Sequence, residues 1–311
     1  MELIIIFIIS LFVTIKGTDL LLSSSVALSH HFRIPETIIG ATILSLITTL
    51  PETSVALFSG IAGHNQLSFG NILGTPLTNL GLIGGITLLS TSSNHGLHEH
   101  LGKRRGIFLL ALVSYLLLSA LFLKEFTFNF GVILSIILIV YFLVTIKIAK
   151  NLNQVGATEK LKFSVKSLEV LIIKFVIGTI LLLLGTKLLT TSGIDLARRL
   201  SVSEEIIGLT FIAIGTSLPE LFTAVTAIAK KESAIALGNF VGASFITLTL
   251  PFTIALYFSP IPIAKTHSFN IFLLSLLCII TLIFSFKPWV RKPAGFTLLA
   301  IYLIFILTLL L

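Results

Sequence analysis

Apolar residues occur along the chain in runs of about 20, the length at which an α-helix crosses the hydrocarbon layer of a bilayer. Short segments rich in polar and charged residues separate these runs. The pattern therefore predicts an all-α integral membrane protein with ten transmembrane helices. The helices are expected at residues 2–25, 36–63, 67–92, 105–123, 128–149, 168–193, 204–229, 233–258, 267–285 and 293–311.

Composition agrees with a membrane protein and argues against other classes. Hydrophobic residues make up 55% of the chain and charged residues only 11%, whereas soluble domains carry about 25% charged residues. The formal net charge of +8 does not indicate a nucleic-acid partner, because the basic residues lie in short loops between the apolar runs. Glu2 stands where a signal peptide would carry basic residues, so we expect the first run to be a retained span.

The distribution of Lys and Arg between loops predicts the orientation of the chain. Ten spans place both termini on one side of the membrane. Loops on the opposite side contain 14 of the 21 basic residues, and loops on the side of the termini contain 4. Because cytoplasmic loops are enriched in Lys and Arg, both termini are predicted to lie outside the cytoplasm, and segment 150–167 inside. The expected location is the plasma membrane or inner membrane of the cell.

The two halves of the chain repeat one another at an offset of 168 residues. Residues 17–52 align without a gap on residues 185–220, and 15 of the 36 positions are identical, including Gly, Thr, Pro and Glu. Matches at these residue types are hard to obtain by chance between apolar helices. The chain is therefore divided into a first five-helix repeat (1–149), a cytoplasmic linker (150–167) and a second five-helix repeat (168–311).

Five spans in each repeat make the second repeat enter the membrane from the side opposite to the first. Inverted repeats are typical of secondary transporters, in which the substrate site lies near the middle of the membrane where the repeats meet. Channels are built in this way less often. The polar motifs that recur at the centre of both copies lie within residues 40–85 and 208–251.

The second span of each repeat contains a proline followed directly by a glutamate, Pro51-Glu52 and Pro219-Glu220. Proline has no N–H for the helical hydrogen bond, and this leaves backbone carbonyls free in the preceding turn. Within a membrane, free carbonyls occur only where they face protein or a water-filled cavity. Intramembrane acids are costly and mark functional sites. A packing kink explains one such proline, but the symmetric recurrence of Pro-Glu indicates a site.

Free carbonyls beside carboxylates form a site of hard oxygen ligands, which suits Ca²⁺ or Na⁺. Two opposed glutamates supply two negative charges, and these would neutralise one Ca²⁺. The predicted metal ligands are the carboxylates of Glu52 and Glu220 and the backbone oxygens of Thr48 and Thr216, with the hydroxyls of Thr49 and Ser217 in reach.

The third span of each repeat begins with a Gly-Asn-x-x-Gly motif. Small residues four positions apart allow two helices to approach closely. The expected close-packing positions are the glycines of these motifs, Gly70, Gly74, Gly238 and Gly242. Thr75 and Asn79 are four residues apart and share one helix face, which is expected to turn toward the glutamates. Asn71 and Asn239 are polar enough to need partners within the membrane.

These motifs resemble those of the cation/Ca²⁺ exchanger superfamily, of the sodium/calcium exchanger type. The Gly-Thr-Ser-Leu-Pro-Glu stretch at 215–220, the Gly-Asn-x-x-Gly stretches and the inverted ten-helix plan carry the resemblance, which spans essentially the whole chain. The resemblance implies that Glu52 and Glu220 bind the transported ion, together with backbone oxygens of the preceding threonines. The further ligand positions that it implies on the third and eighth spans fall on Thr75, Asn79, Ala243 and Thr247.

The chain departs from the family pattern most clearly in the second repeat. The family pattern after Gly-Asn-x-x-Gly is Ser-Asn-x-x-Asn/Asp, whereas this chain reads Thr-Pro-x-x-Asn in the first copy and Ala243-Ser244-x-x-Thr247 in the second. Ala243 lacks a hydroxyl, and Thr247 lacks an amide or acid. The expected Ca²⁺ ligands are therefore intact, while the Na⁺ ligands are fewer, and proton coupling through the glutamates stays open.

The sequence thus predicts a secondary active antiporter that exchanges Ca²⁺ for Na⁺ or H⁺ by alternating access. Its expected ligands are the transported ions, with no cofactor, and its expected surroundings are the lipid bilayer. A cation channel with a carboxylate filter and an exchanger of altered specificity or regulatory role stay open as alternatives. An intramembrane enzyme is not expected, because the predicted spans contain no Ser/His or metal-ligand constellation. No pattern in the sequence indicates an oligomeric state.

Overall fold

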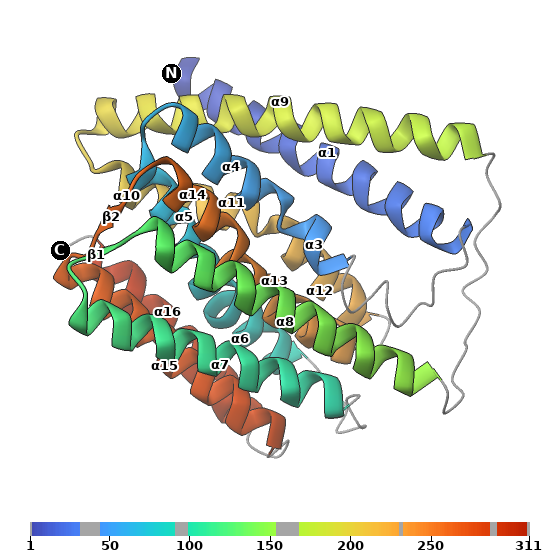
Figure 1. Ribbon diagram of the computed structural model, residues 1–311. Helices are drawn as coiled ribbons and strands as arrows, with labels where there is room; N and C mark the ends of the chain where they lie inside the picture. Colours follow the sequence, from blue (N-terminus) through green and yellow to red (C-terminus); the bar gives the residue numbers. More distant parts are fainter. Residues whose placement is uncertain are drawn as a thin grey trace.

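The computed structural model describes residues 2–31, 44–90, 99–153, 168–229, 233–286 and 291–309. Nearly all of these residues are helical, and the two halves of the chain contain corresponding series of helices (Figure 1). The first half comprises α1 (Glu2–His31), α3 (Leu44–Thr48), α4 (Leu50–Ile61), α5 (Asn65–Leu77), the π-helix η2 (Thr78–Ile83), α6 (Gly84–Ser90), α7 (Glu99–Phe122) and α8 (Phe128–Asn153). The second half comprises α9 (Leu168–Leu200), α10 (Glu204–Ile207), the π-helix η3 (Gly208–Ile212), α11 (Ala213–Thr216), α12 (Leu218–Ala229), α13 (Ser233–Thr247), α14 (Leu250–Phe258), α15 (Lys265–Phe286) and α16 (Arg291–Thr308).

Nine helical stretches in the described residues are long and apolar enough to cross a membrane, and they correspond to nine of the ten predicted spans. Helices α3 and α4 lie in the remaining predicted span, 36–63, of which residues 36–43 lie outside the described residues. Some predicted ends are too early, because α1 continues to His31, α9 to Leu200 and α8 to Asn153. Two arginines in the last turn of α9 favour its extension, since basic side chains interact favourably with a helix C-terminus.

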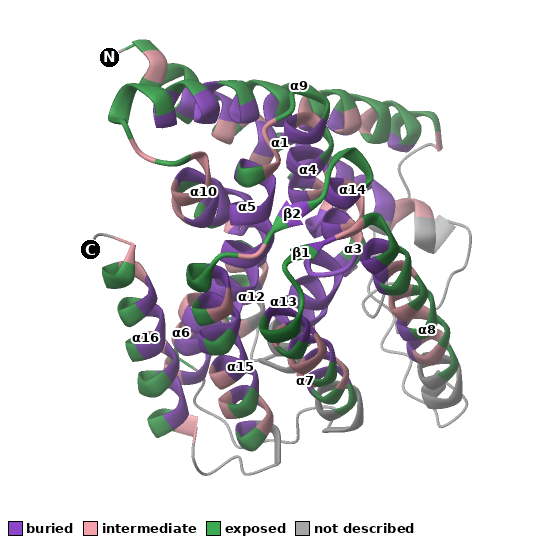
Figure 2. Ribbon diagram, turned by 60° about the vertical axis from the view of Figure 1, so that its left-hand side comes forward, coloured by how far each residue is buried: buried purple, intermediate pink, exposed green. Residues whose placement is uncertain are grey.

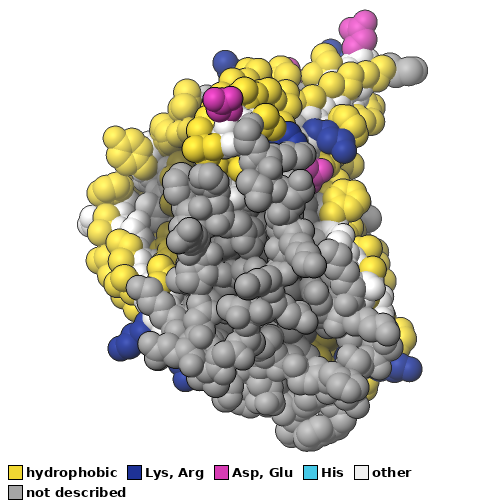
Figure 3. All heavy atoms as spheres, turned by 90° about the vertical axis from the view of Figure 1, so that its right-hand side faces the viewer, with side chains coloured by type: hydrophobic (Ala, Val, Ile, Leu, Met, Phe, Trp, Pro, Cys, Tyr) yellow, Lys and Arg dark blue, Asp and Glu magenta, His cyan; other side chains and the backbone are white. Residues whose placement is uncertain are grey.

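The outward-facing surface is apolar, as a protein surrounded by lipid requires. Ile5, Ile9 and Phe12 on α1 are each at least half exposed, and α8 and α9 present similar rows of Ile, Leu and Val. Among the described atoms in Figure 3, hydrophobic side chains cover most of the surface. A water-soluble monomer rarely exposes so large an apolar surface. The chain is thus an all-α integral membrane protein, and both termini lie toward the same end of it (Figure 1), as an even number of crossings requires.

Helices α1 and α9 pack along one another at one edge of the molecule (Figure 1). Glycines bring the two backbones into contact, because a Cβ on Gly178 would lie 2.6 Å from the Leu21 nitrogen. A Cβ on Gly185 would likewise lie 2.6 Å from the Thr14 nitrogen. Gly17, the repeat equivalent of Gly185, also meets the backbone of the other helix. The first helices of the two repeats therefore form a closely packed pair that sequence symmetry leads one to expect.

The helices that carry the recurring motifs lie at the buried centre of the molecule (Figure 2). Helix α5 of the first repeat packs on α10 and η3 of the second, and α13 of the second repeat packs on α3 of the first. Helices α7, α8, α15 and α16 flank this centre. Two short strands, β1 (Glu125–Phe126) and β2 (Ile261–Pro262), pair antiparallel and join the α7–α8 and α14–α15 connections. The crossed packing places the motifs of one repeat against those of the other.

Candidate functional site

Each Pro-Glu motif lies just after a break in a helix. Helix α3 ends at Thr48 and α4 begins at Leu50, while α11 ends at Thr216 and α12 begins at Leu218. The proline is the second residue of the new helix in both cases. Because proline has no N–H, the carbonyl four residues earlier receives no helical hydrogen bond from it. The breaks predicted from the sequence are therefore present, at equivalent places in the two repeats.

Glu52 and Glu220 are fully buried in the first turns of α4 and α12, where the positive end of the helix dipole favours a carboxylate. The two side chains are close enough to repel one another. The Thr216 hydroxyl faces the Glu52 carboxylate, and the Thr48 hydroxyl faces Glu220. None of the four carboxylate oxygens accepts a hydrogen bond of standard geometry from the described residues. Buried charges without partners are strongly destabilising, so this arrangement favours the binding of a cation or of protons.

Asn71 on α5 connects the two repeats beside the glutamates. Its side-chain oxygen accepts hydrogen bonds from the hydroxyls of Thr75 and Thr216, each at 3.3 Å. Its side-chain nitrogen has no hydrogen-bond partner among the described residues, and the residue is fully buried. The side-chain oxygen of Asn71 therefore has the hydrogen-bond partners that the sequence led us to expect, and one of them, Thr216, belongs to the other repeat.

Glycines on both sides of this contact let α5 and the second repeat touch through their backbones. A Cβ on Gly74 would lie 2.5 Å from the Leu209 carbonyl oxygen, and a Cβ on Gly70 would lie 2.9 Å from the Leu209 nitrogen. A Cβ on Gly242 would meet the Ser45 hydroxyl at 2.8 Å. All four predicted close-packing positions lie at contacts between repeats. Gly70 and Gly74 meet backbone atoms, whereas Gly242 and Gly238 meet side chains, those of Ser45 on α3 and Arg105 on α7.

Two π-helices, which were not predicted from the sequence, interrupt the central helices. η2 begins two residues after Pro76, which removes a hydrogen-bond donor inside α5. Asn79 lies in η2, is fully buried, and has no hydrogen-bond partner for either side-chain atom among the described residues. η3, which belongs to the second repeat, packs against α5 of the first repeat. π-Helical turns are frequent at functional sites, which agrees with an unpaired polar side chain in η2.

The second repeat presents fewer polar groups at the equivalent positions. Ala243 is buried and apolar, and the Ser244 hydroxyl donates to the carbonyl of its own helix at Phe240, at 2.7 Å. Thr247 and Asn239 are buried, and their polar side-chain atoms lack hydrogen-bond partners among the described residues. Among the described residues, each repeat therefore has three unpaired polar side-chain atoms at these positions, although the second repeat has no polar side chain at Ala243.

The two hydroxyls predicted to lie beside the threonine carbonyls differ. The Thr49 hydroxyl donates to the carbonyls of Ser45 and Leu46 in its own helix, each at 3.0 Å. The Ser217 hydroxyl is buried and has no hydrogen-bond partner among the described residues. Ser217 is thus a free polar group at the helix break, whereas the hydrogen of Thr49 is directed back along α3.

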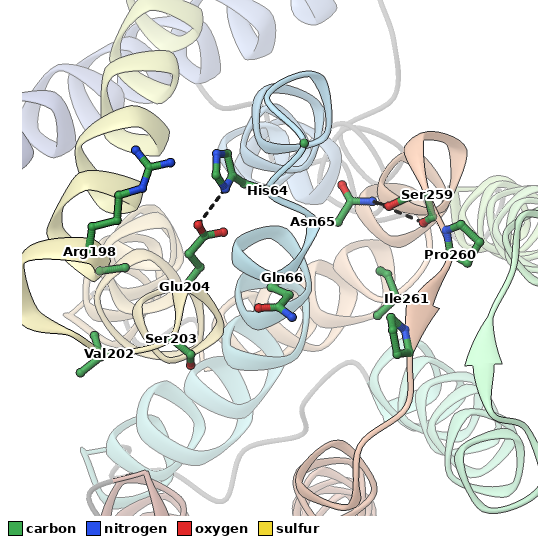
Figure 4. Close-up of a pocket in the computed structure, with 13 residues that line it drawn as sticks. His64, Asn65, Gln66, Arg198, Val202, Ser203, Glu204, Ser259, Pro260 and Ile261 are labelled. Atoms are coloured by element: carbon green, nitrogen blue, oxygen red, sulfur yellow. Dashed lines mark hydrogen bonds and ion pairs between the residues drawn. The ribbon is translucent and has the colours of Figure 1, made fainter.

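A cavity of about 510 Å³ lies between the α4–α5 turn, the end of α9 and the segment that leads into β2 (Figure 4). His64 from the α4–α5 turn and Glu204 from α10 face one another across it, with Nδ1 and Oε1 2.7 Å apart. A second histidine, His267 of α15, lies 3.0 Å from Glu205. Neither glutamate is among the ion ligands predicted from the sequence, and no predicted ion ligand lines the cavity. The histidine partners come from distant segments, which no local sequence pattern reveals.

Comparison with known proteins places both halves of the chain in one family. A sequence model of the family described as sodium/calcium exchanger protein matches residues 2–149 and 170–311. Inner membrane protein YrbG of Escherichia coli is 29% identical over 295 residues, covering 92% of this chain and 88% of that protein. Sodium/calcium exchanger MaX1 of Methanosarcina acetivorans is 24% identical over 350 residues, covering 98% of this chain and 97% of that protein.

The arrangement of the helices is also found in a solved structure. The sodium-calcium exchanger NCX_Mj, soaked with 2.5 mM Na⁺ and 10 mM Sr²⁺, matches with a TM-score of 0.69 at 23% identity. The match covers 98% of this chain and 98% of that one. The likeness therefore extends over the whole fold, including both repeats.

Proposed function

Since the chain belongs to the sodium/calcium exchanger protein family, we propose that it is a secondary active antiporter that exchanges Ca²⁺ for Na⁺ or H⁺. The observation that carries the proposal is the pair of buried glutamates, Glu52 and Glu220, at symmetric helix breaks, whose carboxylate oxygens accept no hydrogen bond of standard geometry from the part of the chain that the structure describes. Such a pair lacks positive charge, and the transported ion supplies it.

The ligands proposed for Ca²⁺ are the two carboxylates and the backbone oxygens of Thr48 and Thr216. Oxygen ligands from carboxylates and carbonyls are those that Ca²⁺ prefers, and two carboxylates balance its charge. The hydroxyls of Thr75 and Ser217, with the Asn79 amide, are proposed to complete the site or to bind the counter-ion. Thr247 is proposed to take part less, because its side chain is shorter than the Asn at the equivalent position of the first repeat. The Thr49 hydroxyl donates its hydrogen within its helix and could contribute only its lone pairs.

Transport is proposed to occur by alternating access, in which the site opens to one side of the membrane at a time. The closely packed pair α1 and α9 would move relative to the central helices. The empty site, with two unpaired negative charges, resists the transition because the charges lose access to water. One Ca²⁺, or monovalent cations or protons in its place, removes this cost. This produces exchange, because the protein changes the side to which the site opens only when the site holds a cation or protons.

Both termini are proposed to lie outside the cytoplasm of a cell whose plasma or inner membrane holds the protein. Lys124 and Lys147 are exposed residues near the two ends of α8 and would lie on opposite sides. In a Cys278→Ala background, a thiol reagent that does not cross membranes is expected to label Lys124→Cys in intact cells. It should label Lys147→Cys only after permeabilisation. The reverse labelling would contradict the proposed orientation.

The function is tested by uptake of radiolabelled Ca²⁺ into proteoliposomes under imposed Na⁺ or H⁺ gradients. Wild-type protein is compared with Glu52→Gln and Glu220→Gln, and with Glu125→Gln as a control, since Glu125 is exposed in β1. We expect uptake to follow one gradient, to be lost in both buried variants and to persist in the control. Normal uptake by both buried variants would contradict the proposal. Ca²⁺ flux that needs no counter-ion gradient would instead identify a channel.

A further inference from the structure

Asn71 is placed to control how a hydroxyl of the other repeat is oriented. It lies on α5 between Gly70 and Gly74, at the backbone contact with η3. Its side-chain oxygen is 3.3 Å from the hydroxyls of both Thr75 and Thr216. A carbonyl oxygen has two lone pairs and accepts both hydrogens at once. One side chain thus holds a hydroxyl from each repeat.

The Thr216 hydroxyl has one hydrogen and three acceptors around it. These are the Asn71 side-chain oxygen at 3.3 Å, the Ala213 carbonyl oxygen at 3.5 Å and the Glu52 carboxylate. A hydroxyl that donates to a carboxylate points its hydrogen into the site, where it opposes a cation. A hydroxyl that donates to Asn71 points its hydrogen away and leaves its lone pairs to the site.

We propose that Asn71 is a positioning residue that holds the Thr216 hydroxyl hydrogen away from the glutamate pair, so that the hydroxyl can accept a cation there. The inference rests on the proposed function and adds a residue to its site. Asn71 holds the Thr216 hydrogen in the structure, and neither Glu52 carboxylate oxygen accepts a hydrogen bond of standard geometry from the described residues. The Thr216 hydroxyl thereby keeps its lone pairs available to a cation bound at the glutamates. The same oxygen holds the Thr75 hydrogen, so that Thr75 also presents lone pairs only.

The second repeat lacks this device, although it contains the equivalent asparagine. Asn239 corresponds to Asn71 at the repeat offset, but its side-chain atoms have no hydrogen-bond partner among the described residues. The Thr48 hydroxyl, equivalent to that of Thr216, donates to the Ser45 carbonyl of its own helix at 3.3 Å. Asn239 therefore provides a control that is matched in residue type, burial and membrane depth.

The experiment compares Asn71→Leu, Asn71→Ala and Asn71→Asp with Asn239→Leu in the same proteoliposomes. Loss of the acceptor should raise the KM for Ca²⁺ about tenfold, equivalent to 1.4 kcal/mol, with a smaller change in the maximal rate. Asn71→Asp keeps an acceptor at the same place but adds a negative charge beside the glutamate pair, so its KM for Ca²⁺ should not rise. Asn239→Leu should change KM less than threefold. Binding is also measured without transport, as the increase in melting temperature that Ca²⁺ causes in detergent. This increase should be smaller for Asn71→Ala than for the wild-type protein.

A double-mutant cycle separates positioning from a general packing role. In a Thr216→Val background there is no hydrogen to accept from that residue, so Asn71→Ala should raise KM far less than it does in the wild type. Equal effects in both backgrounds, or a KM for Asn71→Ala equal to that of Asn239→Leu, would overturn the inference. If Asn71→Leu does not fold, Asn71→Ala and the cycle decide. Wild-type protein without Glu52-dependent Ca²⁺ uptake would refute the proposed function instead.

Discussion

Gly74 offers a test of the contact between repeats on which the site depends. A Cβ added there would lie 2.5 Å from the Leu209 carbonyl oxygen and 2.7 Å from Ala213 Cβ, whereas ordinary contacts begin at 3.4 Å. Neither neighbour is the end of a flexible side chain, so Gly74→Ala must separate α5 from the η3–α11 segment by about 1 Å. Overpacking of this kind costs about 1–3 kcal/mol, and the better helix propensity of Ala returns at most about 1 kcal/mol.

The expected result is a lower melting temperature together with a loss of transport. Each kcal/mol corresponds to about 2–4 °C in a chain of 150–250 residues and to less in a longer chain, so Gly74→Ala should melt roughly 2–4 °C lower in detergent. The hydrogen bond from Thr216 to Asn71 is already 3.3 Å long, and a further 1 Å, roughly, takes it beyond hydrogen-bond distance. Ca²⁺ uptake into proteoliposomes should therefore fall with stability.

The control is Gly131→Ala in α8, where a Cβ would lie 3.4 Å from Leu256 Cβ, an ordinary contact. This variant gains helix propensity without a clash, and it should melt at or above the wild-type temperature and transport normally. If Gly74→Ala matched Gly131→Ala in both measurements, the two repeats would not be held together at this point in the way the backbone geometry indicates.

Further predictions follow from the helix breaks, the second repeat and the outer cavity. Pro51→Ala restores a helical N–H donor and should leave the melting temperature unchanged or raised while uptake falls roughly tenfold; Pro293→Ala in the first turn of α16, where proline costs nothing, should transport normally. Ala243→Thr combined with Thr247→Asn copies the first repeat and should strengthen inhibition of Ca²⁺ uptake by Na⁺, with the KM for Ca²⁺ little changed; no change in Na⁺ inhibition would contradict a ligand role for these positions. Glu204→Gln weakens a partly exposed pair with histidine that is worth at most about 1 kcal/mol, and differential scanning fluorimetry should show a smaller shift than for Gly74→Ala.

The spans were predictable because the bilayer imposes a length and requires every backbone group to be bonded within its helix. The predicted ranges 204–229 and 233–258 coincide with the limits of α10–α12 and α13–α14. The breaks after Thr48 and Thr216 follow from prolines that lack a donor. Each of these features depends on residues that are close in sequence, so the chain alone specifies them.

The partners of the polar side chains were not predictable in the same way. The hydrogen bond between Asn71 and Thr216 joins residues 145 positions apart, and it depends on which faces of two helices cross. A Thr hydroxyl bonds either to its own helix or to a neighbouring one, and Thr49 and Thr216 show the two outcomes. Pro76 lacks a hydrogen-bond donor, and the position at which the helix changes to the π-helical pattern as a result depends on how the helix packs.

The unpaired groups at the centre show what kind of ligand the fold requires. Glu52, Glu220 and Ser217 are buried with polar atoms that lack hydrogen-bond partners in the described part of the chain. A packed core normally satisfies such groups, because each one left unpaired costs about 1–3 kcal/mol and a buried charge costs more. All the carboxylate and hydroxyl oxygens among them can coordinate a cation. Under the proposed function, the free-energy cost of two unpaired buried carboxylates favours ion binding. The same cost opposes the change between the two states of the transporter when the site is empty. Coupling between binding and exchange then needs no separate gate. The charge of the two glutamates restricts the alternating-access transition to the protein whose site is filled.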